Sequence, residues 1–291
     1  MTMMKKHTVL YSIIILLLFF CFPEVIISSS TSYYFRTLGI NDGLSQSTVN
    51  AILQDQKGFM WIGTKDGLNQ YDGQECRVFQ KENSSLGNNF ITALYEDCEG
   101  YIWVGTDAGV YIYNPVQEAF QFLDTEIASS GEKITRAVTW ITSDSQNNIW
   151  ISVDNQGLFC YNRGKKNLTK VVSCGKSGIA NVTHFWFYAG QLWIARYEDN
   201  LYVSKDNSSF NAFNDVDGED IFKGLVINSY VEGLHNCLYV GTSKGLMEIN
   251  LTSRKVRKLL DEYVRDICFR SDTDLWIGTE QGLYIYNIET D

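Results

Sequence analysis

Apolar and polar residues alternate in short runs along most of the chain, and one such run is repeated. Its clearest copy spans residues 61–71, Trp-Ile-Gly-Thr-Lys-Asp-Gly-Leu-Asn-Gln-Tyr. Aromatic and β-branched residues with a two-residue period predict a strand. The Asp-Gly pair predicts a tight turn, because glycine adopts a positive φ without steric cost. The run therefore predicts a β-hairpin.

The hairpin pattern occurs six times, at spacings of 37 to 47 residues. Its first residues are Trp61, Trp103, Trp150, Trp193, Tyr239 and Trp276. The turn glycine is kept at positions 109, 157, 245 and 282. Asn200 replaces it in the fourth copy, and we expect this residue to take the same left-handed conformation, which asparagine tolerates. Strand-like units with a period in the low forties are typical of propeller blades.

Four strands are predicted in each of the first five repeats and three in the sixth. In the first repeat they cover residues 48–54, 59–64, 68–71 and 75–80. A spare β-prone run, Tyr33–Leu38, precedes the first repeat and is expected to complete the sixth blade and close the ring. The predicted fold is an all-β propeller of four-stranded blades. It is either a closed six-bladed ring or an incomplete seven-bladed ring.

The N-terminal 30 residues have the pattern of a signal peptide. Lys5 and Lys6 precede an apolar run at residues 9–22, and Pro23 and several serines follow it. This order of basic, apolar and small residues is typical of export signals. We expect residues 31–291 to form a periplasmic or secreted propeller with no membrane span after signal removal. An uncleaved membrane anchor is the alternative.

Charge and cysteine spacing exclude several kinds of ligand. The chain has 34 acidic and 24 basic residues and no basic run, which argues against nucleic-acid binding. The cysteines form no Cys-x-x-Cys pair, so free thiols, no metal site and no cofactor are expected. An acidic segment, residues 215–220, is interpreted as a solvated turn rather than a calcium site.

Catalytic motifs are absent from the sequence. Outside the N-terminal segment the only histidines are His184 and His235, and no catalytic triad order or glycine-rich phosphate loop is present. We therefore predict no catalytic residues. Because blades bring distant carboxylates together, a secreted propeller lyase or glycosidase stays an alternative. A non-catalytic protein-interaction propeller is the other alternative.

The segment from Asn41-Asp-Gly-Leu-Ser45 to Gly73 resembles the two-component regulator propeller repeat. The resemblance covers about Tyr33 to Asp291 and is clearest in repeats one, two and six. It implies the periplasmic sensor region of Bacteroides-type hybrid histidine kinases, which detect polysaccharide fragments. In that family seven-bladed propellers precede a membrane helix, a kinase, a receiver and a DNA-binding domain. Those later domains are not present here, so the resemblance implies a truncated relative or a stand-alone module.

The repeated aromatic anchors are interpreted as packing between blades. Ligand candidates are instead polar or aromatic residues that break the repeat near the start of each repeat's first strand, facing the centre of the ring. They are Asn89, Arg136, Trp140, His184, Trp186, Asn228 and Arg265. Aromatic faces with Arg and Asn suit an oligosaccharide. We therefore expect an oligosaccharide ligand, with a homodimer or a second propeller as a further partner.

Overall fold

The computed structural model describes residues 33–173, 182–207 and 209–290. The predicted signal peptide, residues 1–30, lies outside the described residues. Residues 38–291 form one compact unit. None of the described segments is a helix long and apolar enough to cross a membrane.

The described strands form six antiparallel sheets, each in sequence order. Blade one holds β1 (Val49–Gln54), β2 (Met60–Thr64), β3 (Gly67–Tyr71) and β4 (Cys76–Phe79), after a 3₁₀ turn at Ile40–Asp42. Blade two holds β5 (Ile91–Glu96), β6 (Ile102–Thr106), β7 (Gly109–Asn114) and β8 (Ala119–Phe122). Blade three holds β9 (Val138–Ser143), β10 (Ile149–Val153), β11 (Gly157–Asn162) and β12 (Asn167–Ser173).

The second half of the chain continues in the same way. Blade four holds β13 (Val182–Tyr188), β14 (Gln191–Arg196), β15 (Leu201–Ser204) and β16 (Asn211–Ala212). Blade five holds β17 (Ile227–Glu232), β18 (Cys237–Thr242), β19 (Gly245–Asn250) and β20 (Lys255–Leu260). Blade six holds β21 (Val264–Phe269), β22 (Asp274–Thr279) and β23 (Leu283–Asn287).

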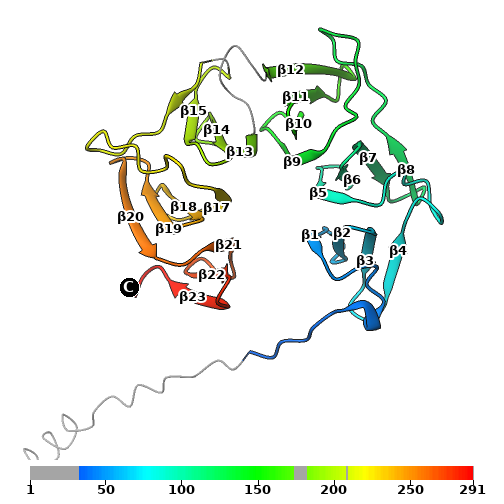
Figure 1. Cartoon of the computed structure of the whole chain (residues 1–291), viewed down its shortest axis with the longest axis horizontal. Helices are drawn as coiled ribbons and strands as arrows, with labels where there is room; N and C mark the ends of the chain where they lie inside the picture. The colour runs from blue at the N-terminus through cyan, green and yellow to red at the C-terminus, as the bar shows by residue number, and fades with distance from the viewer. Residues whose placement is uncertain (1–32, 174–181, 208, 291) are drawn as a thin grey trace, which may run out of the picture. The chain divides into compact units, whose positions relative to one another are not determined.

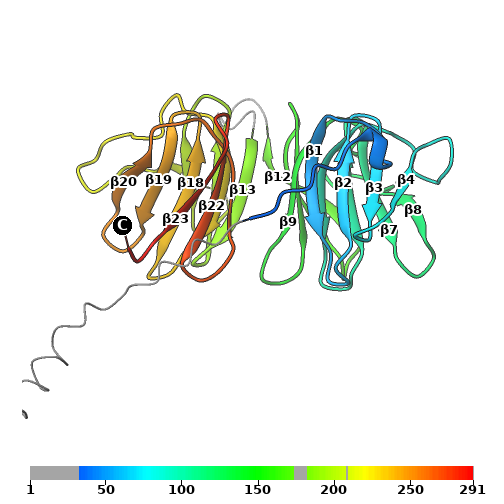
Figure 2. The same ribbon diagram turned by 90° about the horizontal axis from the view of Figure 1, so that it is seen from below.

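The six blades are arranged in a ring, and the first strand of each blade lies nearest its centre (Figure 1; Figure 2 shows the ring from the side). We call these six strands the inner strands. Neighbouring inner strands contact one another from β1 around to β17 and β21. The predicted all-β propeller is confirmed, and every predicted blade strand has an observed counterpart within about two residues.

The prediction for the spare N-terminal run is wrong. Residues 33–38 form no strand, and the sixth sheet has three strands. Tyr34 and Phe35 are 99% and 72% exposed. So short a run with its large apolar side chains in solvent gains too little burial to offset the entropy of ordering its backbone. Between β21 and β1 the contact is at most marginal, so the ring is open there.

The glycine of the repeated Trp-x-Gly-Thr motif lets one blade pack closely against the next. A Cβ on Gly63 would lie 2.5 Å from Ile91 Cγ2, on the inner strand of blade two. A Cβ on Gly105 would lie 2.8 Å from Val138 Cγ1 on blade three. Gly278 in blade six has no such neighbour. The nearest atom to its added Cβ belongs to the same blade, 3.6 Å away.

The threonine of the motif closes the hairpin turn. Its hydroxyl donates to the carbonyl of the turn glycine, at 3.0 Å between Thr64 and Gly67 and at 2.8 to 2.9 Å in blades two, five and six. The expectation for Asn200 is wrong, because the left-handed residue of the fourth turn is Glu198, with φ 49°. Asn200 is buried instead, where its side-chain oxygen accepts the Leu201 N–H.

Five of the six motif aromatics are buried, with exposed fractions between 1% and 4%. Trp276, on the open sixth blade, is half-buried. In the first three blades the indole N–H donates to an aspartate in the turn six residues earlier. The pairs are Trp61–Asp55 at 2.8 Å, Trp103–Asp97 at 2.7 Å and Trp150–Asp144 at 2.9 Å.

Candidate functional site

Asn228 binds the neighbouring blade with its side chain. Its amide donates to the Val264 carbonyl at 2.7 Å, on the first residue of the next inner strand. Asn50 makes the same bond to Ile91 at 2.8 Å, and Thr139 does so with its hydroxyl. All three residues lie at the irregularity near the start of an inner strand. The donor group of Asn228 is therefore occupied by the contact between blades.

The three remaining polar candidates lie apart from the aromatic ones. Asn89, in the loop before β5, accepts the Lys81 N–H at 2.8 Å and donates to Asp66 at 3.1 Å. Arg136 is exposed before β9. Arg265 donates to Glu280 at 2.6 Å, and its side chain is 62% exposed. The hydrogen bonds of Asn89 and Arg265 therefore serve loops and strand ends.

The aromatic candidates come together on the inner strands of blades three to five. The rings of Trp140 and His184 are 4.6 Å apart between centroids. Trp186 stacks on Tyr230 at 4.1 Å with the planes 16° apart, and Tyr230 lies 6.5 Å from Trp140. We call these four residues the inner aromatic group. It joins β9, β13 and β17 into one surface.

Tyr230 was missed in the sequence analysis. It aligns with the aliphatic residues Ile52, Leu94 and Ile141 of β1, β5 and β9, and with Phe185 of β13. An aromatic residue at that aligned position was the available signal.

Several polar atoms of the inner aromatic group are buried without a partner. They are the indole nitrogens of Trp140 and Trp186 and Nδ1 of His184. An unpaired buried polar atom costs about 1–3 kcal/mol, and the large majority of buried polar atoms in proteins have a hydrogen-bond partner. The group therefore offers two donors and one acceptor beside aromatic rings.

His184 is neutral in the folded protein. Burial of its ring lowers the pKa to about 4, although a hydrogen bond to the backbone of Ile227 opposes this shift. Because the ring donates to that carbonyl, its unpaired Nδ1 is an acceptor. A neutral imidazole in this position can accept a hydrogen bond from a sugar hydroxyl while it stays uncharged.

We expect the stability of the protein to fall by about 2 kcal/mol between pH 7.5 and pH 5 on account of His184. The unfolded histidine binds a proton near pH 6.5, whereas the folded one resists until about pH 4, so acid favours unfolding. Urea unfolding of His184→Asn should lose this part of the pH slope. The exposed His235→Gln should keep it, and an equal slope in both variants would contradict the assignment.

Metal and disulfide chemistry are not indicated in the described residues. The carboxylate of Asp215 accepts the N–H groups of Asp217 and Glu219, closing the acidic segment into a turn. No described group of three His, Cys, Asp or Glu residues is placed to hold a metal. The five described cysteines outside the N-terminal segment are free, and Cys174 lies outside the described residues.

Three segments of the chain match a known family. The family described as two component regulator propeller matches residues 43–66, 85–108 and 258–281. A curated relative, histidine kinase P4 of Formosa agariphila, is 42% identical over 50 residues. That match covers 17% of this chain and 4% of the relative.

Solved structures extend the similarity to the whole ring. The extracellular domain of a hybrid two-component system from B. thetaiotaomicron is 26% identical, with a TM-score of 0.72. The match covers 87% of this chain and 35% of that one, so the chain spans about a third of its length. PorZ, a surface component of the Porphyromonas gingivalis type-IX secretion system, shares the fold at 15% identity and TM-score 0.64. That match covers 85% of this chain and 41% of PorZ. The chain is thus a β-propeller in which three segments match the two component regulator propeller family, and it is similar to the extracellular domain of a hybrid two-component system.

Proposed function

We propose that the chain is the periplasmic ligand-sensing propeller of a hybrid two-component system. Its ligand is an oligosaccharide derived from a polysaccharide, and its outputs are a kinase and a DNA-binding domain outside this chain. The regulator repeats and the likeness to an extracellular domain support the sensory part. The inner aromatic group carries the proposal for ligand binding.

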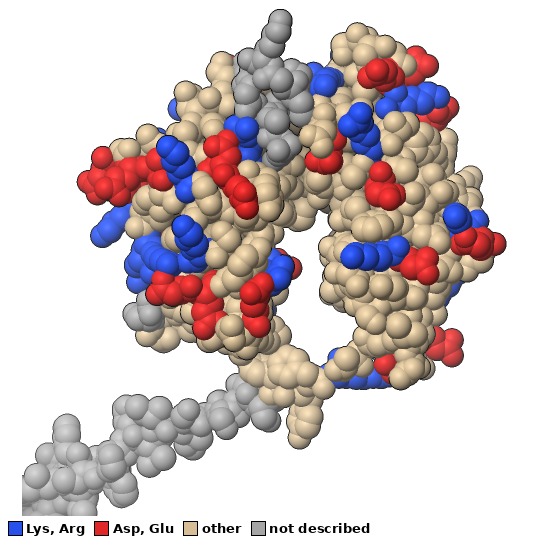
Figure 3. All heavy atoms as spheres, in the orientation of Figure 1, with Lys and Arg blue, Asp and Glu red and all other residues tan. Residues whose placement is uncertain are grey.

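The chemistry of the inner aromatic group matches that of a sugar. A pyranose ring has an apolar C–H face, which packs on aromatic rings, and hydroxyls at its rim. Trp140 and Tyr230 are half-buried. Their strands, β9 and β17, lie nearest the centre of the ring, where Figure 3 shows an opening. The unpaired indole N–H groups and His184 Nδ1 would pair with the hydroxyls.

The proposed mechanism is binding without turnover. The inner aromatic group contains no carboxylate, and its histidine is neutral and hydrogen-bonded to backbone. A bound ligand would favour one arrangement of paired sensor chains, either a homodimer or a contact with a second propeller. The equilibrium would shift by the difference in ligand affinity between the two arrangements.

A thermal-shift screen against plant, host and microbial oligosaccharides tests this proposal. A ligand at 100 times its dissociation constant should stabilise the protein by about 2.7 kcal/mol. Trp140→Leu should weaken binding of that ligand at least about tenfold, because it removes a ring and a donor. Tyr197→Leu, at an aromatic residue 53% exposed in a turn, is the matched control. Absence of any stabilising glycan, or equal affinity in Trp140→Leu, would overturn the proposal.

A further inference from the structure

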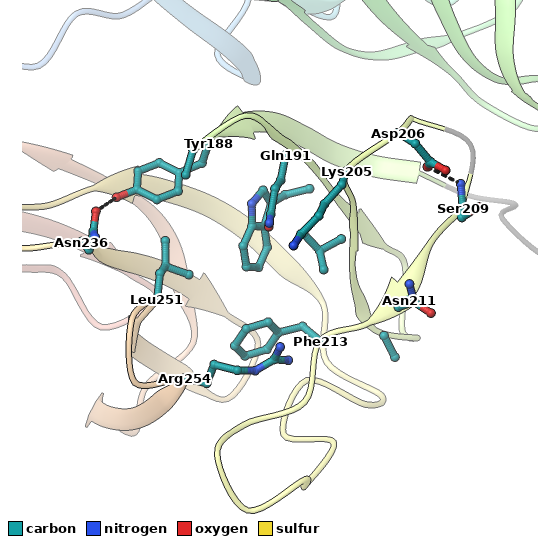
Figure 4. Close-up of a pocket in the computed structure, with 14 residues that line it drawn as sticks. Tyr188, Gln191, Lys205, Asp206, Ser209, Asn211, Phe213, Asn236, Leu251 and Arg254 are labelled. Atoms are coloured by element: carbon teal, nitrogen blue, oxygen red, sulfur yellow. Dashed lines mark hydrogen bonds between the residues drawn. The ribbon is translucent and has the colours of Figure 1, made fainter.

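A cavity lies between blades four and five, and residues of both blades line it (Figure 4). Its volume is about 570 Å³. The turn between β13 and β14, the end of β15 and the turn between β19 and β20 contribute its walls. The residues that matter below are Gln191, Trp193, Lys205, Asn211 and Leu251.

Trp193 in this cavity lacks the partner that other blades provide. In blades one to three a turn aspartate accepts the indole N–H of the motif tryptophan. Trp193 is 3% exposed, and its Nε1 is buried with no partner. This donor is paired in blades one to three and has no partner in blade four, where a cavity adjoins it. The arrangement points to an acceptor supplied from outside the chain.

The local sequence explains the missing aspartate. In blade four Tyr188 pairs directly with Gln191, so only Ala189 and Gly190 form the turn, with φ 49° and 71°. The equivalent turn of blade one is five residues long between its paired strand ends and begins with Asp55. The shorter turn removes the carboxylate, and its Ala189 lines the cavity instead.

The cavity also has an unpaired cation. Lys205 makes no hydrogen bond or ion pair among the described contacts, and Figure 4 shows its side chain beside Gln191 at the cavity. Arg254 is committed elsewhere, because its guanidinium donates to the Asn214 carbonyl at 2.6 and 3.0 Å. Asp206, the single carboxylate of the lining, accepts the Ser209 N–H at 2.8 Å.

A matching cavity between blades one and two has the opposite charge balance. It measures about 500 Å³ and lies beside the equivalent turn. Four carboxylates and two cations line it, namely Asp55, Glu96, Glu99, Glu118, Lys57 and Arg77. In a chain with a net charge of −10, the cavity of blades four and five is therefore unusual in favouring an anion.

We propose that the cavity between blades four and five binds a carboxylate carried on a ring with an apolar face. Lys205 pairs with the carboxylate, and Leu251 and Val203 contact the apolar face. Gln191 and Asn211 donate to ring substituents, and an acceptor oxygen of the ligand reaches the Trp193 N–H as Gln191 moves aside. Two sources share this chemistry, a uronic acid and an aromatic carboxylic acid.

Isothermal titration with matched acid and neutral probes tests this site on the whole chain. The pairs are glucuronic acid with glucose and 4-hydroxycinnamic acid with its amide. At least one acid should bind ten times more tightly than its neutral partner. The acid that does so shows whether the carboxylate of the ligand belongs to a uronic acid or to an aromatic acid. Lys205→Gln should abolish that tenfold preference, while Lys165→Gln, an equal charge change on an exposed turn of blade three, should keep it.

Two results would overturn the proposal. One is that neither acid binds more tightly than its neutral partner. The other is that Lys205→Gln, shown to unfold like the wild type, keeps the preference. The Trp140→Leu variant separates this site from the inner aromatic group, because it should leave acid binding here unchanged. A loss of acid binding in Trp140→Leu alone would place the acid at the inner aromatic group.

Discussion

Replacing Gly105 by alanine lowers the free energy of unfolding by as much as about 3 kcal/mol. The added Cβ would lie 2.8 Å from Cγ1 of Val138 and 3.0 Å from its Cβ, where blade three packs on blade two. Val138 is fully buried in the core cluster between these blades, so it has little room to move. Urea unfolding followed by tryptophan fluorescence measures the loss.

The same substitution at Gly278 is the matched control. This glycine occupies the equivalent motif position of blade six, and the nearest atom to an added Cβ is 3.6 Å away. Its φ is not in the left-handed region, so we expect alanine to raise the free energy of unfolding by about 0.4–1 kcal/mol, because the unfolded chain becomes stiffer. Equal losses in Gly105→Ala and Gly278→Ala would contradict the role given to the motif glycine.

Trp103→Phe should lower the free energy of unfolding by about 1.5–3 kcal/mol more than Trp193→Phe. Both changes remove the same indole atoms from buried positions, 2% and 3% exposed. Only Trp103 loses a hydrogen bond to a carboxylate, its 2.7 Å bond to Asp97. Trp193→Phe instead removes a buried donor that has no partner.

Asp97 makes this difference large. It is 1% exposed, and its carboxylate also accepts the Tyr101 N–H at 3.1 Å and the Arg163 guanidinium at 2.9 Å. Loss of the indole donor removes one bond from a buried, charged network. Chemical unfolding of the two variants side by side gives the difference. Equal losses would show that the Asp97–Trp103 bond contributes no net stability.

The strands could be predicted well from the sequence, because the same pattern of strands and turns occurs in six copies and each copy supports the others. Glycine recurs at the same position of the hairpin in several repeats, and each copy predicts a turn there. Glycines 67, 109, 245 and 282 all have the positive φ that such a turn requires. The same logic failed at Asn200, where a side-chain hydrogen bond to Leu201 fixed a different turn. It also failed at residues 33–38, since a β-prone pattern alone does not supply a partner strand.

The candidate site could be predicted only in part. Trp140 and Trp186 stand out because most other repeats have smaller residues at these positions, and with His184 and Tyr230 they meet in space. Asn228 has the same kind of signal, but its amide serves the contact between blades. The unpaired Trp193 N–H could not be read from the sequence, because it depends on the length of a turn and on what surrounds the indole.

The most direct measurement follows one oligosaccharide that stabilises the protein through a long incubation. Titration heat reports binding, and a reducing-end assay of the same sample reports cleavage. If the chain is a sensor, binding is saturable at one site per chain, is weakened by Trp140→Leu, and returns the ligand intact. Steady formation of new reducing ends at a rate proportional to protein concentration would contradict the sensor account and favour a propeller glycosidase or lyase.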